Sequence, residues 1–135
     1  MKELLGSEVV VSVPARADFV HVIRTVTASV AARLDFPYDA IDDLRLAVDE
    51  ACAQLLAVGG ESSTLTLRMT PTEEGLGLLT TLDAPHVDWP PADAEGSLPW
   101  RLMSALADVV TFEQGDDGPA IHLTKALSSI DRDRG

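Results

Sequence analysis

The chain is poor in positive charge, in cysteine and in aromatic side chains. Its 10 Lys+Arg stand against 22 Asp+Glu, which gives a formal charge of −12. Proteins that hold a nucleic-acid backbone or an anionic membrane surface use clustered Lys and Arg, so we expect neither partner. A single cysteine, Cys52, allows no intramolecular disulfide and no cysteine-rich metal site. The N-terminal residues contain no long apolar run, which predicts neither signal peptide nor membrane span and favours a cytoplasmic location.

Apolar residues are nevertheless plentiful enough for a core. Hydrophobic residues make up 46% of the chain and charged residues 24%, which is typical of a globular domain. Because aromatic residues make up only 4% of the chain, Val, Leu, Ile and Ala have to form that core. We expect one domain over residues 1–135, with a frayed tail from about residue 128.

The spacing of apolar residues changes along the chain between the helical and the strand period. Two helices are predicted first, over 16–34 and from about Asp39, which can cap the second one, to the glycines at 59 and 60. A third is expected near 100–107, after a long loop over 84–99. The predicted strands are residues 8–13, 64–69, 76–82, 109–112 and 120–124. The order β-α-α-β-β-α-β-β predicts an α+β fold, a two-layer sandwich.

Glu50 and Gln54 are the residues of the second helix that can carry chemistry. They are four positions apart, so they lie on one side of the helix, nearly opposite the apolar stripe that includes Leu44 and Val48. Leu46 and three alanines surround them, and we expect this second side to be covered as well. A carboxylate there can act as a general base, and an amide oxygen can help to hold Mg²⁺. The alternative is an ordinary polar pair on a half-exposed helix face.

The run from Leu34 to Leu56 resembles the first signature of the RsbW-type anti-sigma factors, which have the histidine-kinase-like (Bergerat) ATPase fold. The chain is similar to the actinobacterial UsfX-like branch in particular. The shared runs are Asp43-Leu-Arg-Leu-Ala-Val-Asp-Glu50 and Ala105-Leu-Ala-Asp108. The resemblance implies a mixed, mostly antiparallel sheet covered on one face by three helices. It also implies a homodimer that binds an alternative sigma factor and an anti-anti-sigma factor of the STAS type.

Several site residues follow from the resemblance, position by position. Glu50 matches the catalytic glutamate of the family, and Gln54 stands where an asparagine binds Mg²⁺. Asp83 matches the aspartate that reads adenine, and Gly96 with Ser97 lies at the second glycine box. The resemblance therefore implies ATP and Mg²⁺ as cofactors. However, Pro85 and Val87 replace the two glycines after Asp83, and Pro99 replaces another near Ser97; proline offers no amide to a phosphate.

Two functions remain open at this point. One is an anti-sigma factor that sequesters an alternative sigma factor and is released by its anti-anti-sigma partner. The other is an Mg-ATP-dependent serine kinase acting on that partner, with Glu50 as base. A regulatory domain with another protein client is a third interpretation. Arg24 matches an arginine that contacts a partner in the family, although a solvated arginine explains it equally well. The strong negative charge favours a binder of a basic protein surface over a nucleotide site.

Histidine and cysteine give no metal site by spacing. His21, His86 and His122 fall in three different predicted elements, with no pair at helical spacing. Cys52 falls on the apolar stripe of the second helix and is expected to be a small buried hydrophobe.

Overall fold

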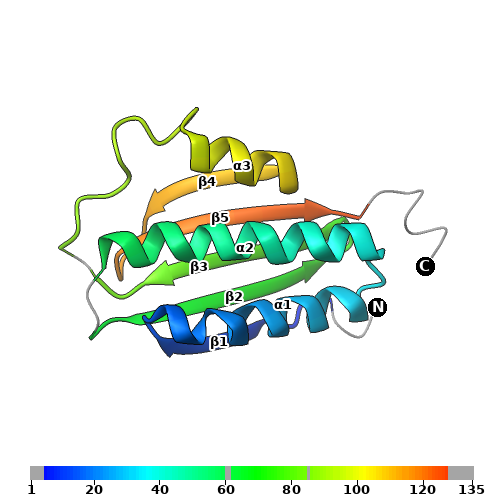
Figure 1. The fold of residues 1–135 in the computed structure, drawn as a ribbon. Helices are drawn as coiled ribbons and strands as arrows, with labels where there is room; N and C mark the ends of the chain where they lie inside the picture. Colours follow the sequence, from blue (N-terminus) through cyan, green and yellow to red (C-terminus); the bar gives the residue numbers. More distant parts are fainter. Residues whose placement is uncertain (1–4, 60–61, 85, 128–135) are drawn as a thin grey trace.

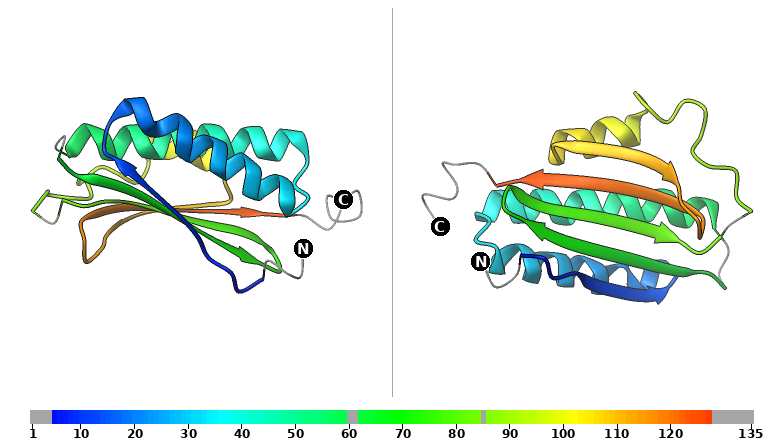
Figure 2. Two further views of the ribbon diagram at one scale, coloured as in Figure 1. Left: turned by 90° about the horizontal axis from the view of Figure 1, so that it is seen from below. Right: turned by 180° about the vertical axis from the view of Figure 1, so that it is seen from behind.

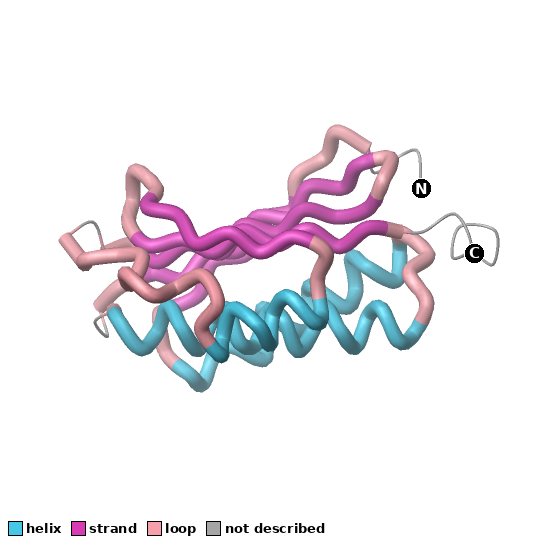
Figure 3. Tube along the Cα trace, turned by 90° about the horizontal axis from the view of Figure 1, so that it is seen from above, coloured by secondary structure: helices cyan, strands magenta, loops and turns pink. Residues whose placement is uncertain are grey.

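The structure, a computed structural model, describes residues 5–59, 62–84 and 86–127. Within these residues, a five-stranded sheet carries three helices on one face, and the other face carries none (Figures 1 and 3). The predicted α+β two-layer fold is therefore confirmed. The elements are β1 (Val9–Pro14), a 3-10 turn (Ala17–Phe19), α1 (Val20–Arg33), α2 (Tyr38–Val58), β2 (Thr64–Thr72), β3 (Gly75–Leu82), α3 (Leu98–Leu106), β4 (Val109–Gln114) and β5 (Pro119–Ala126).

The strands are ordered β1-β2-β3-β5-β4, and Figure 2 shows how the sheet twists. All four pairings are antiparallel. Our expectation of a mixed sheet is corrected on this point: within the described residues no strand pair is parallel. Hairpins join β2 to β3 and β4 to β5, and hairpin connections produce antiparallel neighbours.

The core lies between the sheet and the layer of three helices, and α2 contributes the most buried residues of the three. Leu65, Leu67 and Met69 of β2 alternate toward the helices and are fully buried, as the period of two predicts. Leu44, Val48, Cys52 and Leu55 of α2 are also fully buried, which confirms the predicted stripe. Two buried positions of the described chain are polar: the Thr27 hydroxyl of α1 donates to the carbonyl of Ile23 at 2.8 Å, whereas the Thr80 hydroxyl of β3 has no hydrogen-bond partner.

The residue that caps α2 differs from the one that the sequence predicts. Pro37 is the N-cap of α2, and its carbonyl accepts from the amide of Ile41 at 3.0 Å. Asp39 lies inside the first turn, so our assignment of Asp39 as the cap is wrong. The extended ψ of Pro37, 162°, already places its carbonyl to start the helix. Asp39 still lies where the helix dipole favours a negative charge.

Some of our expectations fall outside the described part of the chain. These are the frayed tail from about residue 128, Pro85 and Gly60. The extent of the domain over 1–135 stays a prediction. Among the described helices, none is at once long enough and apolar enough to span a bilayer.

Candidate functional site

Helix α2 lies in the middle of the helix layer, with α1 along one flank and α3 along the other (Figure 1). Because the three helices lie side by side, nothing in the described chain covers the face of α2 that points away from the sheet. Leu46 and Ala53 are exposed there. Our expectation that α2 is covered on two sides is therefore wrong: its outward face forms the shared wall of two grooves.

The first groove runs between α1 and α2 and is charged. Arg24 of α1 lies 3.3 Å from Asp49 of α2, Nη1 to Oδ2, and Arg45 lies 3.6 Å from Asp42. The cavity between these residues has a volume of about 250 Å³. The second oxygen of Asp49, Oδ1, is buried and has no hydrogen-bond partner. Arg24 keeps 37% of its side chain exposed, so a partner protein can reach it.

The second groove, called here the α2–α3 groove, is mainly apolar and has a volume of about 560 Å³. Four of the six large exposed hydrophobic residues of the described chain lie on its two helices: Tyr38, at 86% exposure, Leu46, at 56%, Leu98, at 61%, and Leu102, at 47%. The residues that line it are Leu46, Asp49, Glu50, Ala53, Leu102, Ala105 and Leu106. Two carboxylates thus stand on one wall of an otherwise aliphatic groove.

Lys125 of β5 fixes the end of this groove. Its ammonium donates to the carbonyl of Leu106, the last residue of α3, at 2.9 Å and lies 3.4 Å from the carboxylate of Asp43 in α2. A cation at the C-terminus of a helix is favourable because the last carbonyls lack partners. No local pattern in the sequence marks Lys125, since 82 positions separate it from Asp43.

Glu50 and Gln54 are both half-buried, one helical turn apart as predicted. Glu50 lines the α2–α3 groove, and neither side chain has a hydrogen-bond or ion-pair partner among the described residues. The groove that contains Glu50 contains neither Gln54 nor Asp83. The residues that the family uses as one site are therefore not gathered around one cavity there.

Asp83 follows the last residue of β3 and is exposed. The next amide, that of Ala84, is already used, because it donates to the carbonyls of Leu82 at 2.9 Å and of Asp117 at 3.0 Å. The amide of Val87 donates to the carbonyl of Ala84 at 3.2 Å. The chain after β3 is thus held against the β4–β5 turn, and these two amides are not free for a ligand.

Ser97 is the N-cap of α3. Its hydroxyl donates to the carbonyl of Ala94 at 2.6 Å and accepts from the amide of Trp100 at 3.4 Å. Such a cap satisfies one of the free amides of the helix and leaves the hydroxyl little capacity for a phosphate. Gly96 has a φ of +85°, and a Cβ atom added to it would have no neighbour within 4 Å. The positive φ of the turn therefore explains the glycine, and the close approach of another group does not.

The long loop before α3 is anchored on β4 and β5. The ring of Trp89 is buried and stacks on Phe112 of β4, with centroids 5.4 Å apart. Its indole nitrogen donates to the carbonyl of Ala120 at 3.3 Å. In Figure 1 the loop runs outside the ends of the strands on its way from β3 to α3.

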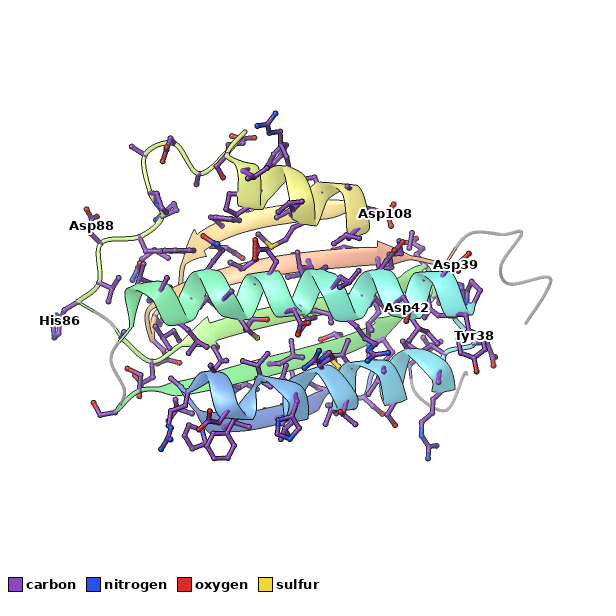
Figure 4. All side chains as sticks on the ribbon, in the orientation of Figure 1. Tyr38, Asp39, Asp42, His86, Asp88 and Asp108 are labelled. Carbon is purple, nitrogen blue, oxygen red and sulfur yellow. The ribbon has the colours of Figure 1, made fainter. Side chains whose placement is uncertain are left out.

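Acidic side chains gather at one end of the helix layer. In Figure 4, Asp39 and Asp42 lie near the start of α2 and Asp108 lies just after the end of α3, while His86 and Asp88 lie at the opposite end, on the loop. Within the described residues, no three His, Cys, Asp or Glu side chains are grouped as a metal site.

Burial, followed by the negative charge of Asp49, raises the pKa of the Cys52 thiol to about 12. The side chain is fully buried. This agrees with its expected role as a small buried hydrophobe and makes it a poor nucleophile, because the thiolate is the reactive form.

Comparison with known proteins gives a consistent family. Residues 13–125 match the family model described as "Histidine kinase-like ATPase domain". The anti-sigma-F factor RsbW of Mycobacterium tuberculosis (strain ATCC 25618 / H37Rv) is 33% identical over 105 residues, which cover 77% of this chain and 61% of the relative. The serine-protein kinase RsbW of Halalkalibacterium halodurans is 30% identical over 132 residues, 86% of this chain and 81% of the relative. That of Bacillus subtilis is 27% identical over 141 residues, 90% of this chain and 88% of the relative. The chain thus spans less than two thirds of the length of the mycobacterial relative.

Proposed function

Because the chain belongs to the RsbW-type anti-sigma factors of the histidine kinase-like ATPase family, we propose that it binds and sequesters an alternative sigma factor. An anti-anti-sigma protein of the STAS type releases the sigma factor by competing for the same helical surface. Binding of the sigma factor requires no nucleotide.

One observation carries the choice of a binder over a kinase. Two polar groups near the expected nucleotide positions already have partners inside the protein: the Ser97 hydroxyl caps α3, and the Ala84 amide bonds to Leu82 and Asp117. A nucleotide needs free donors to replace its water. The Ser97 hydroxyl and the Ala84 amide therefore offer ATP no free donor, which supports the binder, and we assign no chemical step to ATP.

Charge supports the same choice. The α2–α3 groove presents Asp49 and Glu50, and no Lys or Arg lines it within the described residues. ATP carries several negative charges, so this wall repels it unless Mg²⁺ compensates. A basic protein surface is attracted by the same two carboxylates and by the acidic end of the helix layer.

Gel filtration tests the binder directly. The protein is mixed in turn with each sigma factor of its host, without nucleotide, and we expect one alternative sigma factor to co-elute. If none co-elutes with or without Mg-ATP, the proposed function is wrong.

The kinase remains the competing function, and calorimetry separates the two. We expect no heat of binding with millimolar Mg-ATP and no mass increase when the anti-anti-sigma partner is incubated with the protein and Mg-ATP. Saturable binding together with a phosphoserine on the partner would establish the kinase instead.

A homodimer completes the proposal, and the open face of the sheet is the surface we assign to it. The strand residues on that face are mainly small and uncharged, such as Thr66, Gly77 and Thr81; Arg68 and Glu113 are the charged ones. A second copy of a chain of charge −12 meets little repulsion there. Five strands of about seven residues give about 550 Å² per copy, so the pair buries about 1,100 Å², at the low end for a stable interface.

Sedimentation equilibrium tests the dimer. We expect Thr81→Glu to shift the protein toward monomer, because two sheets would then bury unpaired carboxylates. Thr25→Glu, at an exposed position of α1, is the matched control. The assignment would be contradicted if the wild-type protein were monomeric both at high concentration and after 100-fold dilution.

A further inference from the structure

We propose that the α2–α3 groove holds an amphipathic helix of the sequestered sigma factor. The apolar side chains of that helix lie between Leu46 and Leu102, and a lysine or arginine beside them pairs with Glu50 or Asp49. This inference rests on the proposed function and names the surface and the kind of segment that binds there.

The distribution of exposed apolar residues points to this groove. Leu46 and Leu102 are about half exposed on its two walls, and Ala53 and Ala105 leave room between them. The other large exposed apolar residues do not line the groove: Val10 lies on β1, Val109 on β4, Tyr38 at the start of α2 and Leu98 at the start of α3. A contiguous apolar patch with a polar rim is typical of a protein-binding site.

The backbone around the groove favours a helix over an extended peptide. Both walls are helices, whose amides and carbonyls bond internally, so an extended segment would find no strand edge to pair with. A helix satisfies its own backbone and can lay one apolar face into the groove. Helix α3 has nine residues, a length of about 13 Å at the rise of an α-helix, which matches two to three turns of a bound helix.

The charge of the wall selects a basic segment. Glu50 has no partner within the described residues, and Arg24 reaches Asp49 only from the α1 side, at Oδ2. The second oxygen of Asp49, Oδ1, is buried and has no hydrogen-bond donor, so a cation of the bound segment can reach this carboxylate only at Oδ2. A second copy of this chain is a poor occupant because it has 10 basic residues against 22 acidic ones. A cationic side chain at the centre of an apolar contact also supplies specificity.

The groove is held in shape before binding. Lys125 ties the last carbonyl of α3 to Asp43 of α2, and the Ser97 cap fixes the other end of α3. A preformed groove saves the entropy of ordering two helices on binding.

The test uses the sigma factor that co-elutes in gel filtration and measures its dissociation constant with single variants of this protein. We expect Leu46→Ser and Leu102→Ser each to weaken binding about tenfold or more, as central apolar contacts do. Tyr38→Ser, which changes a residue of 86% exposure at the start of α2, is the matched control and is expected to stay within about twofold. Circular dichroism and melting of each variant check that the fold is kept.

A size change distinguishes insertion from general stickiness. Ala53→Trp adds apolar surface but fills the groove, so we expect it to weaken binding about as much as Leu102→Ser does. Glu50→Lys is expected to weaken binding and to reduce its dependence on salt.

The results of these measurements distinguish a wrong groove assignment from a wrong proposed function. If a sigma factor co-elutes but Leu46→Ser, Leu102→Ser and Ala53→Trp all bind it as the wild type does, the groove assignment is overturned and the proposed function stands. If Ala53→Trp strengthens binding, the groove does not hold the segment. If no sigma factor co-elutes, the proposed function falls, and this inference falls with it.

Discussion

Arg24 of α1 and Asp49 of α2 are joined by an ion pair of 3.3 Å, and the other oxygen of the same carboxylate is buried without a partner. The pair sits on the ridge between the two grooves of the helix layer, since Asp49 lines both. The pair therefore joins Arg24, for which the family resemblance implies a partner contact, to the α2–α3 groove, which we propose for the sigma factor.

The Arg24–Asp49 pair is expected to contribute little to stability. Its side chains are 37% and 31% exposed, so solvent screens the attraction, and a double-mutant cycle with Arg24→Gln and Asp49→Asn should give a coupling below about 1 kcal/mol. Urea unfolding of the four proteins measures it. For sigma binding, Arg24→Gln should cost about fivefold or more if the arginine also contacts the partner. An unchanged dissociation constant would make Arg24 a helix-to-helix contact alone.

Thr80 offers a stabilising substitution. Its hydroxyl is fully buried and unpaired, so Thr80→Val removes an unsatisfied group at nearly constant volume and should raise the free energy of unfolding by about 1 kcal/mol. Calorimetric melting checks this. Thr81→Val is the control, because the Thr81 hydroxyl donates to the carbonyl of Thr66 at 3.4 Å and its removal brings no gain. A lower melting temperature for Thr80→Val would show that the hydroxyl has a partner after all.

Lys125 should be worth more to stability than the exposed ion pairs. Its side chain is 17% exposed and serves both Leu106 and Asp43, so we expect Lys125→Met to lower the free energy of unfolding by about 1–2 kcal/mol. Arg68→Met is the control, because Arg68 and Glu8 are each 48% exposed, and that change should cost less than about 0.5 kcal/mol. Equal losses in the two variants would contradict the capping role of Lys125.

Cys52 makes stability depend on pH in the alkaline range. The pKa of its thiol is about 12 in the folded protein against 9.0 for a solvated thiol, as in the unfolded chain, so between these values the unfolded chain loses the proton and the folded protein keeps it. The free energy of unfolding should therefore fall as the pH rises through this window. Between pH 8 and pH 10 we expect the wild type to lose about 1 kcal/mol more than Cys52→Ala.

Thiol labelling gives a second measurement on the same residue. A disulfide reagent should react with Cys52 only at the rate at which the protein opens, and quickly after unfolding in urea. Fast labelling of the native protein, or equal pH dependence in the wild type and Cys52→Ala, would contradict the burial of the thiol.

Periodicity predicted the parts of the fold that depend on local pattern. The alternation around Leu67 and the stripe through Leu44, Val48 and Cys52 are set by which residues must leave water, and these are read from spacing alone. The cap of α2 was wrong because Pro37 and Asp39 both fit the start of a helix, and only the backbone conformation decides between them. The mixed sheet was wrong because the resemblance, not the spacing, supplied it.

The site was less accessible from sequence, for a physical reason. Glu50 and Gln54 were placed correctly on one face, but what covers that face depends on where α1 and α3 pack. Lys125, Leu102 and the Ala84 amide take their roles from contacts with distant segments, which no local spacing reports. The roles of Asp83, Gly96 and Ser97 toward a nucleotide remain predictions, now with the geometry against which they can be tested.

The uncovered face of the sheet has a consequence for stoichiometry. The helix layer, which carries the grooves, and the open face of the sheet lie on opposite sides of the molecule (Figure 3), so two copies joined sheet to sheet would present their helix layers in opposite directions. Each layer could then be loaded separately, and titration would saturate at one sigma factor per chain, without cooperativity. Saturation at one sigma factor per two chains would instead require a single ligand that reaches around the rim of the assembly to both layers.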